Sequence, residues 1–175
     1  MKTRFFIILG LITLVFTDCN LNNESNYTPE IWFYKDPVVN GTDTLNRYLT
    51  DESGVTRLDT IHVGDTVSFQ MYISAYTNNI KAFYITELTD SVTPILLPSK
   101  SSMDSIFLPT SDYSKGKFLL NGTSIDLFFP FKYVAKKASL DAKLTFSVVS
   151  DANFKDFSGS NSSSFVLKTP IVAKK

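Results

Sequence analysis

The sequence predicts an all-β fold, built as a sandwich of two antiparallel sheets. Short runs of alternating apolar and polar residues recur along the chain, separated by Gly, Asn and Asp, and this alternation buries one face of each strand. The composition agrees, because 14% of the residues are aromatic, with 15 Phe and 8 Tyr, and aromatic residues favour strands. No stretch shows a convincing helical repeat of apolar residues.

The clearest predicted strand covers Thr66–Tyr76. Gly64-Asp65 supplies a turn before it, and Asn78-Asn79 interrupts the pattern after it. Because Ile80–Leu88 resumes the alternation, we expect a hairpin between these two strands. The inward positions of the first strand are Val67, Phe69, Met71, Ile73 and Ala75.

Two further hairpins are predicted. Leu45–Thr50 and Val55–Ile61 flank a polar turn. Lys117–Asn121 and Thr123–Phe129 flank Asn121-Gly122, the dipeptide preferred in type I′ turns, where both central residues need positive φ. Each pair is expected to form neighbouring strands of one sheet.

Three more strands complete the pattern. Ile31–Lys35 is the candidate first strand, and its Trp32 is expected to anchor the core. Ala142–Ser150 alternates clearly. Phe165–Val172 contains Pro170, which indicates a sheet edge or a bulge because proline has no N–H to donate.

About nine short strands separated by turns favour an immunoglobulin-like sandwich, with a small barrel as the alternative. Cys19 is the only cysteine in the 175 residues, so the antibody subclass with its paired cysteines is excluded. Burial of apolar surface must therefore supply the stability of the domain.

The N-terminus is typical of a secretory signal peptide. Lys2 and Arg4 precede an uncharged apolar run, Phe5–Phe16, which would extend roughly 18 Å as a helix. A bilayer core is about 30 Å thick, so this run is too short to span it well. A positive head before a short apolar stretch instead predicts a signal peptide over residues 1–18.

Cys19 follows that apolar run closely, and at this point the chain resembles a bacterial lipoprotein precursor. The resemblance implies cleavage before Cys19 and attachment of lipid to its sulfur. Phe16 and Asp18 depart from the usual lipobox, which prefers Leu and a small residue at these places. Asn20, where inner-membrane lipoproteins carry Asp, implies the outer membrane, facing the periplasm or the cell surface. Residues 19–28 are expected to form a flexible tether and 29–175 the domain.

Five triplets of Asp, Ser or Thr, and an aliphatic residue extend this resemblance to uncharacterised Bacteroidetes-type lipoproteins with an immunoglobulin-like domain. In that family the hydroxyl residue of such a triplet carries an O-linked glycan. A strand that begins after an Asp turn gives the same three letters, and both interpretations stay open. The implied glycosylation sites are Thr44, Thr60, Thr66, Ser91 and Ser105.

Candidate catalytic and cofactor motifs are scarce, and we expect no enzyme, metal or cofactor. His62 is the only histidine, which excludes two-histidine metal sites, and neither a G-x-S-x-G elbow nor a nucleotide-binding glycine motif occurs. Asp151–Asp156 resembles a calcium loop, but Lys155 replaces an oxygen ligand. The 17 basic and 17 acidic residues balance, so nothing indicates a nucleic-acid partner.

The expected function is a non-catalytic, membrane-anchored interaction module that binds a protein partner or serves a cell-surface assembly. The alternative is a glycan-binding accessory lipoprotein. Tyr72 and Tyr76, on the wet side of their strand, could stack on sugar rings while their hydroxyl groups form hydrogen bonds.

The lipoprotein interpretation predicts that Cys19→Ala moves the protein from the membrane fraction to the soluble fraction. Lipid chains contribute about 0.8 kcal/mol per buried CH₂, so loss of the sulfur should remove stable anchoring. Fractionation and metabolic labelling with a fatty acid measure this, with Ser25→Ala as the control. Membrane association that persists without Cys19 would contradict the prediction.

Overall fold

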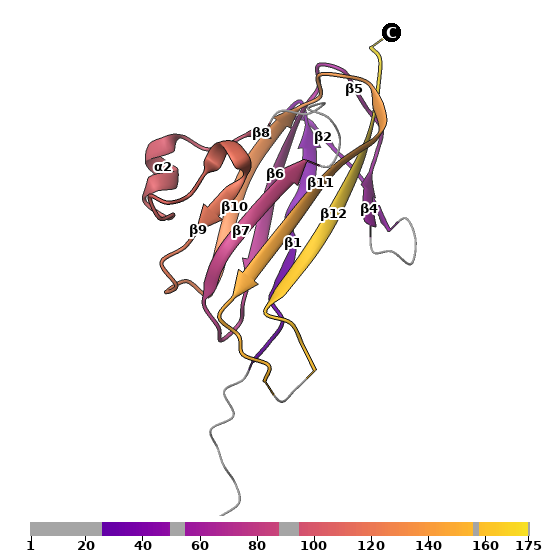
Figure 1. The fold of residues 1–175 in the computed structure, drawn as a ribbon. Coiled ribbons are helices and arrows are strands. Elements are labelled where there is room, and N and C mark those ends of the chain that lie inside the picture. Colours follow the sequence, from indigo (N-terminus) through magenta and orange to yellow (C-terminus); the bar gives the residue numbers. More distant parts are fainter. Residues whose placement is uncertain (1–25, 50–54, 88–94, 156–157, 175) are drawn as a thin grey trace, which may run out of the picture.

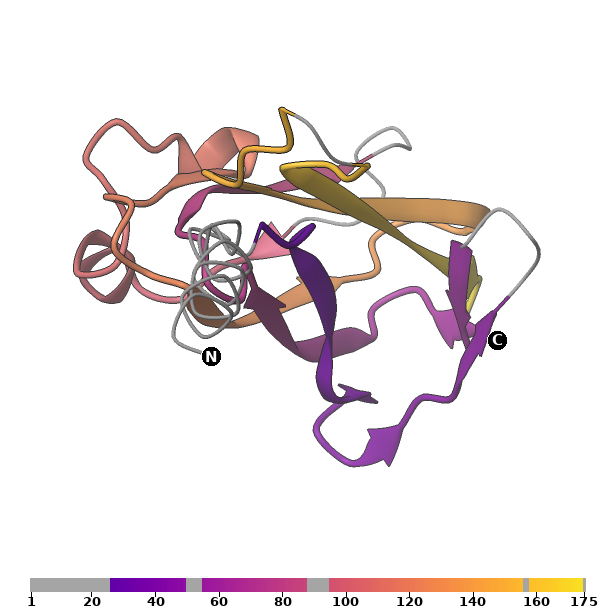
Figure 2. The same cartoon turned by 90° about the horizontal axis from the view of Figure 1, so that it is seen from below.

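The computed structural model describes residues 26–49, 55–87, 95–155 and 158–174 as a sandwich of two sheets (Figure 1). Seen from below, β11 and β12 lie in one layer and β6 in the other (Figure 2). Neighbouring strands of the five-stranded sheet are all antiparallel. In spatial order this sheet contains β2 (Asp43–Thr44), β1 (Glu30–Val39), β6 (Thr66–Ser74), β10 (Asp126–Val134) and β8 (Ile95–Leu96).

The second sheet has seven strands and is mixed. Its strand that comes last in the sequence, β12, pairs antiparallel with β11 but parallel with β4 and β5. The predicted two-sheet sandwich is confirmed, and its sheets are mostly antiparallel. In spatial order it contains β3 (Arg47–Leu49), β4 (Val55–Leu58), β12 (Ser162–Val172), β11 (Ser139–Ser150), β7 (Ile80–Glu87) and β9 (Lys117–Leu119), with β5 (Ile61–His62) beside β12.

Aromatic rings from the two sheets meet in the core. The ring of Phe131 in β10 lies 5.4 Å from that of Phe146 in β11. Phe129 approaches Phe83 of β7 to the same distance. These residues stand on the inward face of strands whose exposure alternates along their length, as period-two side-chain placement requires.

The predicted hairpin between Thr66–Tyr76 and Ile80–Leu88 is wrong. Both segments form strands, but β6 and β7 belong to opposite sheets. The connection crosses the end of the sandwich, where Ile80 N donates to the Ser124 carbonyl at 2.7 Å. Alternation indicates that each strand has a buried face, and it does not distinguish neighbours in one sheet from strands that face each other across the core.

The hairpin predicted at Asn121-Gly122 is also wrong. β9 and β10, on its two sides, lie in different sheets. Gly122 has φ +81°, whereas Asn121 is absent from the described residues with positive φ. The Asn121 side-chain oxygen instead accepts hydrogen bonds from the backbone N–H (3.2 Å) and the hydroxyl (2.7 Å) of Thr123, an Asx turn that redirects the chain.

The hairpin predicted over residues 45–61 is confirmed. β3 and β4 pair antiparallel, with Tyr48 opposite Arg57. Pro170 was predicted to mark a sheet edge or a bulge; β12 lies between β4 and β11, so it is not an edge strand, and the bulge is the alternative that holds. Ser139 pairs with Ile171 and Ala142 with Thr169, so β11 has one extra residue opposite the proline.

The order of strands defines an immunoglobulin-like sandwich. β1, β6 and β10 take the places of strands A, B and E in one sheet. β12, β11 and β7 take those of G, F and C in the other. β8 lies in the position of strand D. β9 lies beside β7 at the edge of the other sheet and comes after β8 in the chain.

Between β8 and β9 the chain forms two short helices, α2 (Lys100–Asp104) and η1 (Tyr113–Lys115), at one side of the sandwich (Figure 1). Phe107 anchors this segment, with its ring 5.3 Å from Phe118 of β9 and 5.9 Å from Phe129 of β10. This one side chain therefore contacts both sheets and closes the core on that side.

Gly116, which ends η1 with φ +63°, is predicted to be intolerant of a side chain. An added Cβ would lie 1.9 Å from the Ile85 carbonyl oxygen, whereas nothing lies within 4 Å of one at Gly41, with φ +79°. Gly41→Ala should cost about 1 kcal/mol of unfolding free energy from the backbone conformation alone. Gly116→Ala should cost at least about 3 kcal/mol. Urea unfolding measures both, and equal losses would contradict the geometry.

Candidate ligand-binding face

The outer faces of the two sheets differ in chemistry. On the seven-stranded sheet, outward positions of β11 carry Thr145 and Ser147, opposite Thr86 and Tyr84 of β7. The strand on the other side of β11, which is β12, is rich in serine. On the five-stranded sheet, three neighbouring strands carry large aromatic side chains outward. The outer face of the five-stranded sheet is therefore the candidate binding face.

An aromatic row crosses this face at right angles to the strands. Trp32 of β1 pairs with Tyr72 of β6, which pairs with Phe128 of β10. The ring centroids of Trp32 and Tyr72 are 4.7 Å apart, and those of Tyr72 and Phe128 are 4.6 Å apart. Trp32 is 37% exposed and Phe128 48%, so the row presents aromatic surface to solvent.

A β-bulge adds a fourth ring. Phe33 pairs with Met71 and Lys35 with Gln70, which leaves Tyr34 as an extra residue on β1. Its side chain is 53% exposed, and its ring meets Phe128 edge-on at 5.1 Å. Bulges commonly re-aim a side chain in this way. Trp32, Tyr34, Tyr72 and Phe128 are hereafter called the aromatic cluster.

Carboxylates border one side of the aromatic cluster. The Tyr72 hydroxyl donates a hydrogen bond to Asp126, which raises the pKa of the phenol. Asp126 and Glu30 both pair with Ser74, at the end of β6. The hydrogen bond holds the Tyr72 ring between its two neighbours.

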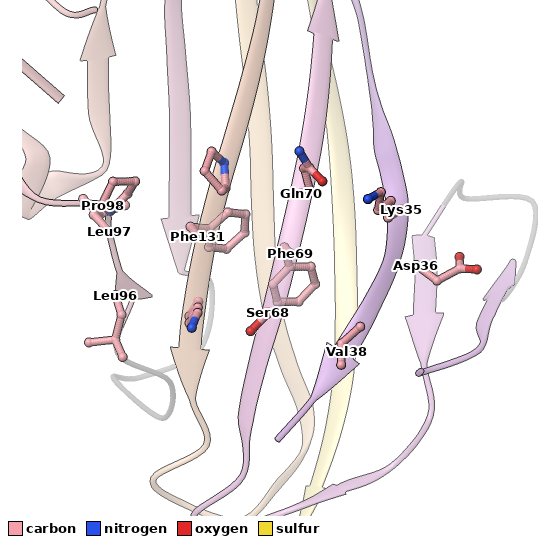
Figure 3. Close-up of a pocket in the computed structure, with 12 residues that line it drawn as sticks. Lys35, Asp36, Val38, Ser68, Phe69, Gln70, Leu96, Leu97, Pro98 and Phe131 are labelled. Atoms are coloured by element: carbon pink, nitrogen blue, oxygen red, sulfur yellow. The ribbon is translucent and has the colours of Figure 1, made fainter. Parts of the chain in front are cut away.

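A groove of about 670 Å³ borders the other side of the cluster. Its floor includes Gln70 and Pro130, the next outward positions after Tyr72 and Phe128. Leu96–Pro98 lie on one side of Ser68 and Gln70, and Lys35, Asp36 and Val38 lie on the other (Figure 3). The wall that contains Leu96 joins the sheet through its pairing with Lys132.

Tyr76 lies apart from the aromatic cluster. It follows β6 with φ +58°, and its ring packs on Tyr27 at 5.3 Å. A hydrogen bond to Glu30 raises the pKa of its phenol. Of the two tyrosines predicted to form a sugar-stacking platform, Tyr72 belongs to the exposed aromatic row. Tyr76 instead contacts residues at the start of β1.

The domain's contacts reach back into the segment predicted as a tether. The Asn26 side-chain oxygen accepts from Asn153 N at 2.9 Å, and Thr28 accepts from Ser160 N at 3.1 Å. Cys19 and the predicted signal peptide lie outside the described residues. Among the helices that are described, none is long and apolar enough to cross a membrane.

The predicted glycosylation sites lie in different surroundings. Thr44, Thr60 and Ser105 are exposed, Thr66 is half-buried, and Ser91 lies outside the described residues. Two aspartates of the triplets shape turns. Asp59 accepts from Asn46 N at 2.8 Å, and Asp65 accepts from His62 N at 2.8 Å. These contacts account for the aspartates at two positions and leave modification of the hydroxyl groups a prediction.

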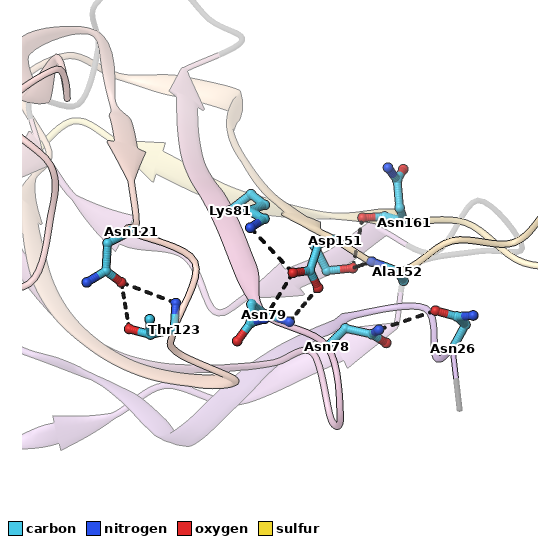
Figure 4. A network of polar contacts seen from close by, with 10 residues as sticks. Asn26, Asn78, Asn79, Lys81, Asn121, Thr123, Asp151, Ala152 and Asn161 are labelled. Carbon is cyan, nitrogen blue, oxygen red and sulfur yellow. Dashed lines mark hydrogen bonds and ion pairs between the residues drawn. The ribbon is translucent and has the colours of Figure 1, made fainter. Parts of the chain in front are cut away.

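The residues considered above as metal-binding or catalytic candidates make structural contacts. Asp151, the first residue of the calcium-like loop, accepts from Asn79 N at 2.7 Å and Asn79 Nδ2 at 3.0 Å, and Lys81 Nζ lies 3.4 Å away (Figure 4). His62 is exposed, with Nδ1 3.8 Å from Asp65. In the described ranges no three His, Cys, Asp or Glu side chains are grouped to hold a metal ion.

Sequence reasoning missed most of the aromatic cluster. Trp32 was expected in the core, and that expectation is wrong, because the adjacent Phe33 takes the inward position at 6% exposure. Phe128 lies between the buried Leu127 and Phe129. In both strands the sequence did contain a sign that the aromatic residue faces outward. The residues directly before and after it already fit the buried face of the strand, so the residue between them must face solvent.

Comparisons with protein-family models and with curated proteins find no match. Among solved structures, the chain is similar to the ASH / PapD-like domain of human CEP192 (PapD-like domain 7), with a TM-score of 0.36 and 9% sequence identity. The similarity covers 86% of this chain and 89% of that chain. The strand order described above carries the assignment to the class of immunoglobulin-like sandwiches.

Asp151 is predicted to stabilise the fold in a pH-dependent manner. The side-chain hydrogen bond from Asn79 lowers the pKa of Asp151 below its usual range, assisted by Asn79 N–H and Lys81. A carboxyl whose folded pKa is depressed contributes stability above its unfolded pKa of about 3.9 and loses it as pH falls through the folded pKa.

Asp151→Asn should therefore lower the unfolding free energy by about 1–2 kcal/mol at pH 7. The difference from the wild type should shrink below about pH 4. Urea unfolding across this pH range measures it, with Asp43→Asn in the exposed strand β2 as the control. A difference that stays constant down to about pH 2 would contradict the assignment.

Proposed function

We propose that this chain is a non-catalytic interaction module, anchored at the outer membrane through lipid on Cys19, that binds a protein partner with its five-stranded sheet. The observation that carries the proposal is the exposed aromatic cluster. Tryptophan, tyrosine and phenylalanine are enriched at the centres of protein interfaces, because they bury much apolar area at little entropic cost.

The contrast between the two faces supports this choice of surface. Outward positions on β11 and its neighbours hold mainly Ser, Thr and Lys, with Tyr84, Val149 and Val166 spread among them and no cluster of rings. An aromatic cluster on the other face, kept exposed while the core holds its own set of rings, is typical of a binding surface. The sheet pairing that sets the row also makes the surface rigid.

Glycan binding is the second candidate. It is favoured by Tyr72, which lies in the aromatic cluster beside a groove, as a sugar-stacking platform would. The rings of Trp32 and Phe128 are tilted by 57° and 55° to that of Tyr72, however, so they pack on one another instead of forming a flat platform. This geometry favours a protein partner.

The proposal predicts that a photo-crosslinking amino acid at Tyr34 captures a specific protein in cells. The same amino acid at Tyr84, on the opposite sheet, should not capture it. Combining the Tyr34 probe with Trp32→Ala and Phe128→Ala should reduce the yield at least about tenfold, since central aromatic anchors dominate binding energy.

Thermal unfolding of each variant is the control for loss of fold. An adduct formed equally from Tyr34 and Tyr84, or one unaffected by loss of the two rings, would overturn the assignment of this face. Binding to an oligosaccharide panel that depends on Trp32 and Phe128, without a protein adduct, would favour the second candidate.

A further inference from the structure

The outer face of the five-stranded sheet changes in character from one end to the other. The row with Ser74 carries the carboxylates of Glu30 and Asp126, and the next row is aromatic. Beyond it the rows carry lysines, Lys35 opposite Gln70 and Lys132 opposite Ser68. The face therefore has an acidic end, an aromatic middle and a basic end that coincides with the groove.

Both groove lysines lack an acidic partner among the described residues. Lys35 and Lys132 appear in none of the ion pairs of these residues. The one described carboxylate that lines the groove, Asp36, lies 2.6 Å from Arg47. Arg47 neutralises that carboxylate, and Lys35 Nζ lies 5.9 Å from the centre of the Tyr34 ring, so neither groove lysine is paired with a carboxylate of the described residues.

The two lysines lie on opposite sides of β6, on β1 and β10. Neighbouring strands are about 4.8 Å apart, so their backbones are separated by roughly 10 Å. Between and beside them the groove is largely apolar, with Val38, Leu96 and Pro130 in its lining. A ligand that fills it needs apolar groups with anionic groups on both sides.

We propose that the groove binds an acidic, apolar-containing peptide segment of the partner protein, with carboxylates at Lys35 and Lys132 and apolar side chains against Leu96 and Pro130. This inference rests on the proposed function and names the chemistry of the partner. The aromatic cluster then contacts the part of the partner adjacent to this segment.

The test uses the full chain in detergent and a labelled peptide of about ten residues in which Glu and Leu alternate. Fluorescence anisotropy should show binding that weakens when Gln replaces Glu in the peptide. Lys35→Gln with Lys132→Gln should lower the affinity roughly fivefold or more. The matched double variant, Lys136→Gln with Lys137→Gln, lies outside the groove and should leave the affinity unchanged.

Salt provides an independent readout, because the Debye length falls to about 3 Å at 1 M ionic strength and screens such contacts. Equal binding of the Glu and Gln peptides, or equal effects of the two double variants, would overturn the proposal. So would binding of oligogalacturonate or phosphatidylglycerol vesicles without binding of the peptide. If the Tyr34 crosslink persists in these cases, the proposed function stands and only the inference that the groove binds an acidic segment is wrong.

Discussion

Packing of aromatic rings between the two sheets is the constraint on which the rest of the structure depends. Cys19 is the only cysteine in the 175 residues, so no disulfide within this sequence joins the layers. Phe33 of β1 meets Phe165 of β12 at 5.5 Å, and similar pairs join β10 to β7 and β11. Because each ring fills an inward position, a slip of one residue in any strand would move its rings to solvent.

The same constraint determines what the outer faces can present. Once the inward positions are set, every second residue on β6 and β10 must face outward, and the pairing of β1, β6 and β10 aligns Trp32, Tyr72 and Phe128 in one row. The bulge at Tyr34 then brings a fourth ring to that row without disturbing Phe33. Core packing and the candidate binding face are thus two consequences of one strand register.

Strand positions were largely predictable from the sequence, because alternation is a local property. The alternation of Thr66–Tyr76 and Ala142–Ser150 marked β6 and β11 well. The pairing of strands was less predictable, since β6 and β7 follow each other in sequence as the two arms of a hairpin would but belong to opposite sheets. The aromatic cluster and the groove were missed for a related reason: both join β1, β6 and β10, and only the register between distant strands brings those side chains together.

The position of the final strand has a consequence for how the chain assembles. β12 lies between β11 and β4, and Val166 pairs with Val55 from early in the chain. The larger sheet therefore stays divided until residues 162–172 are in place, and contacts of such wide sequence separation slow folding. A chain that stops before Ser162 would leave two strand edges open to pairing with other molecules, so shortening the C-terminus should yield aggregates and no smaller folded domain.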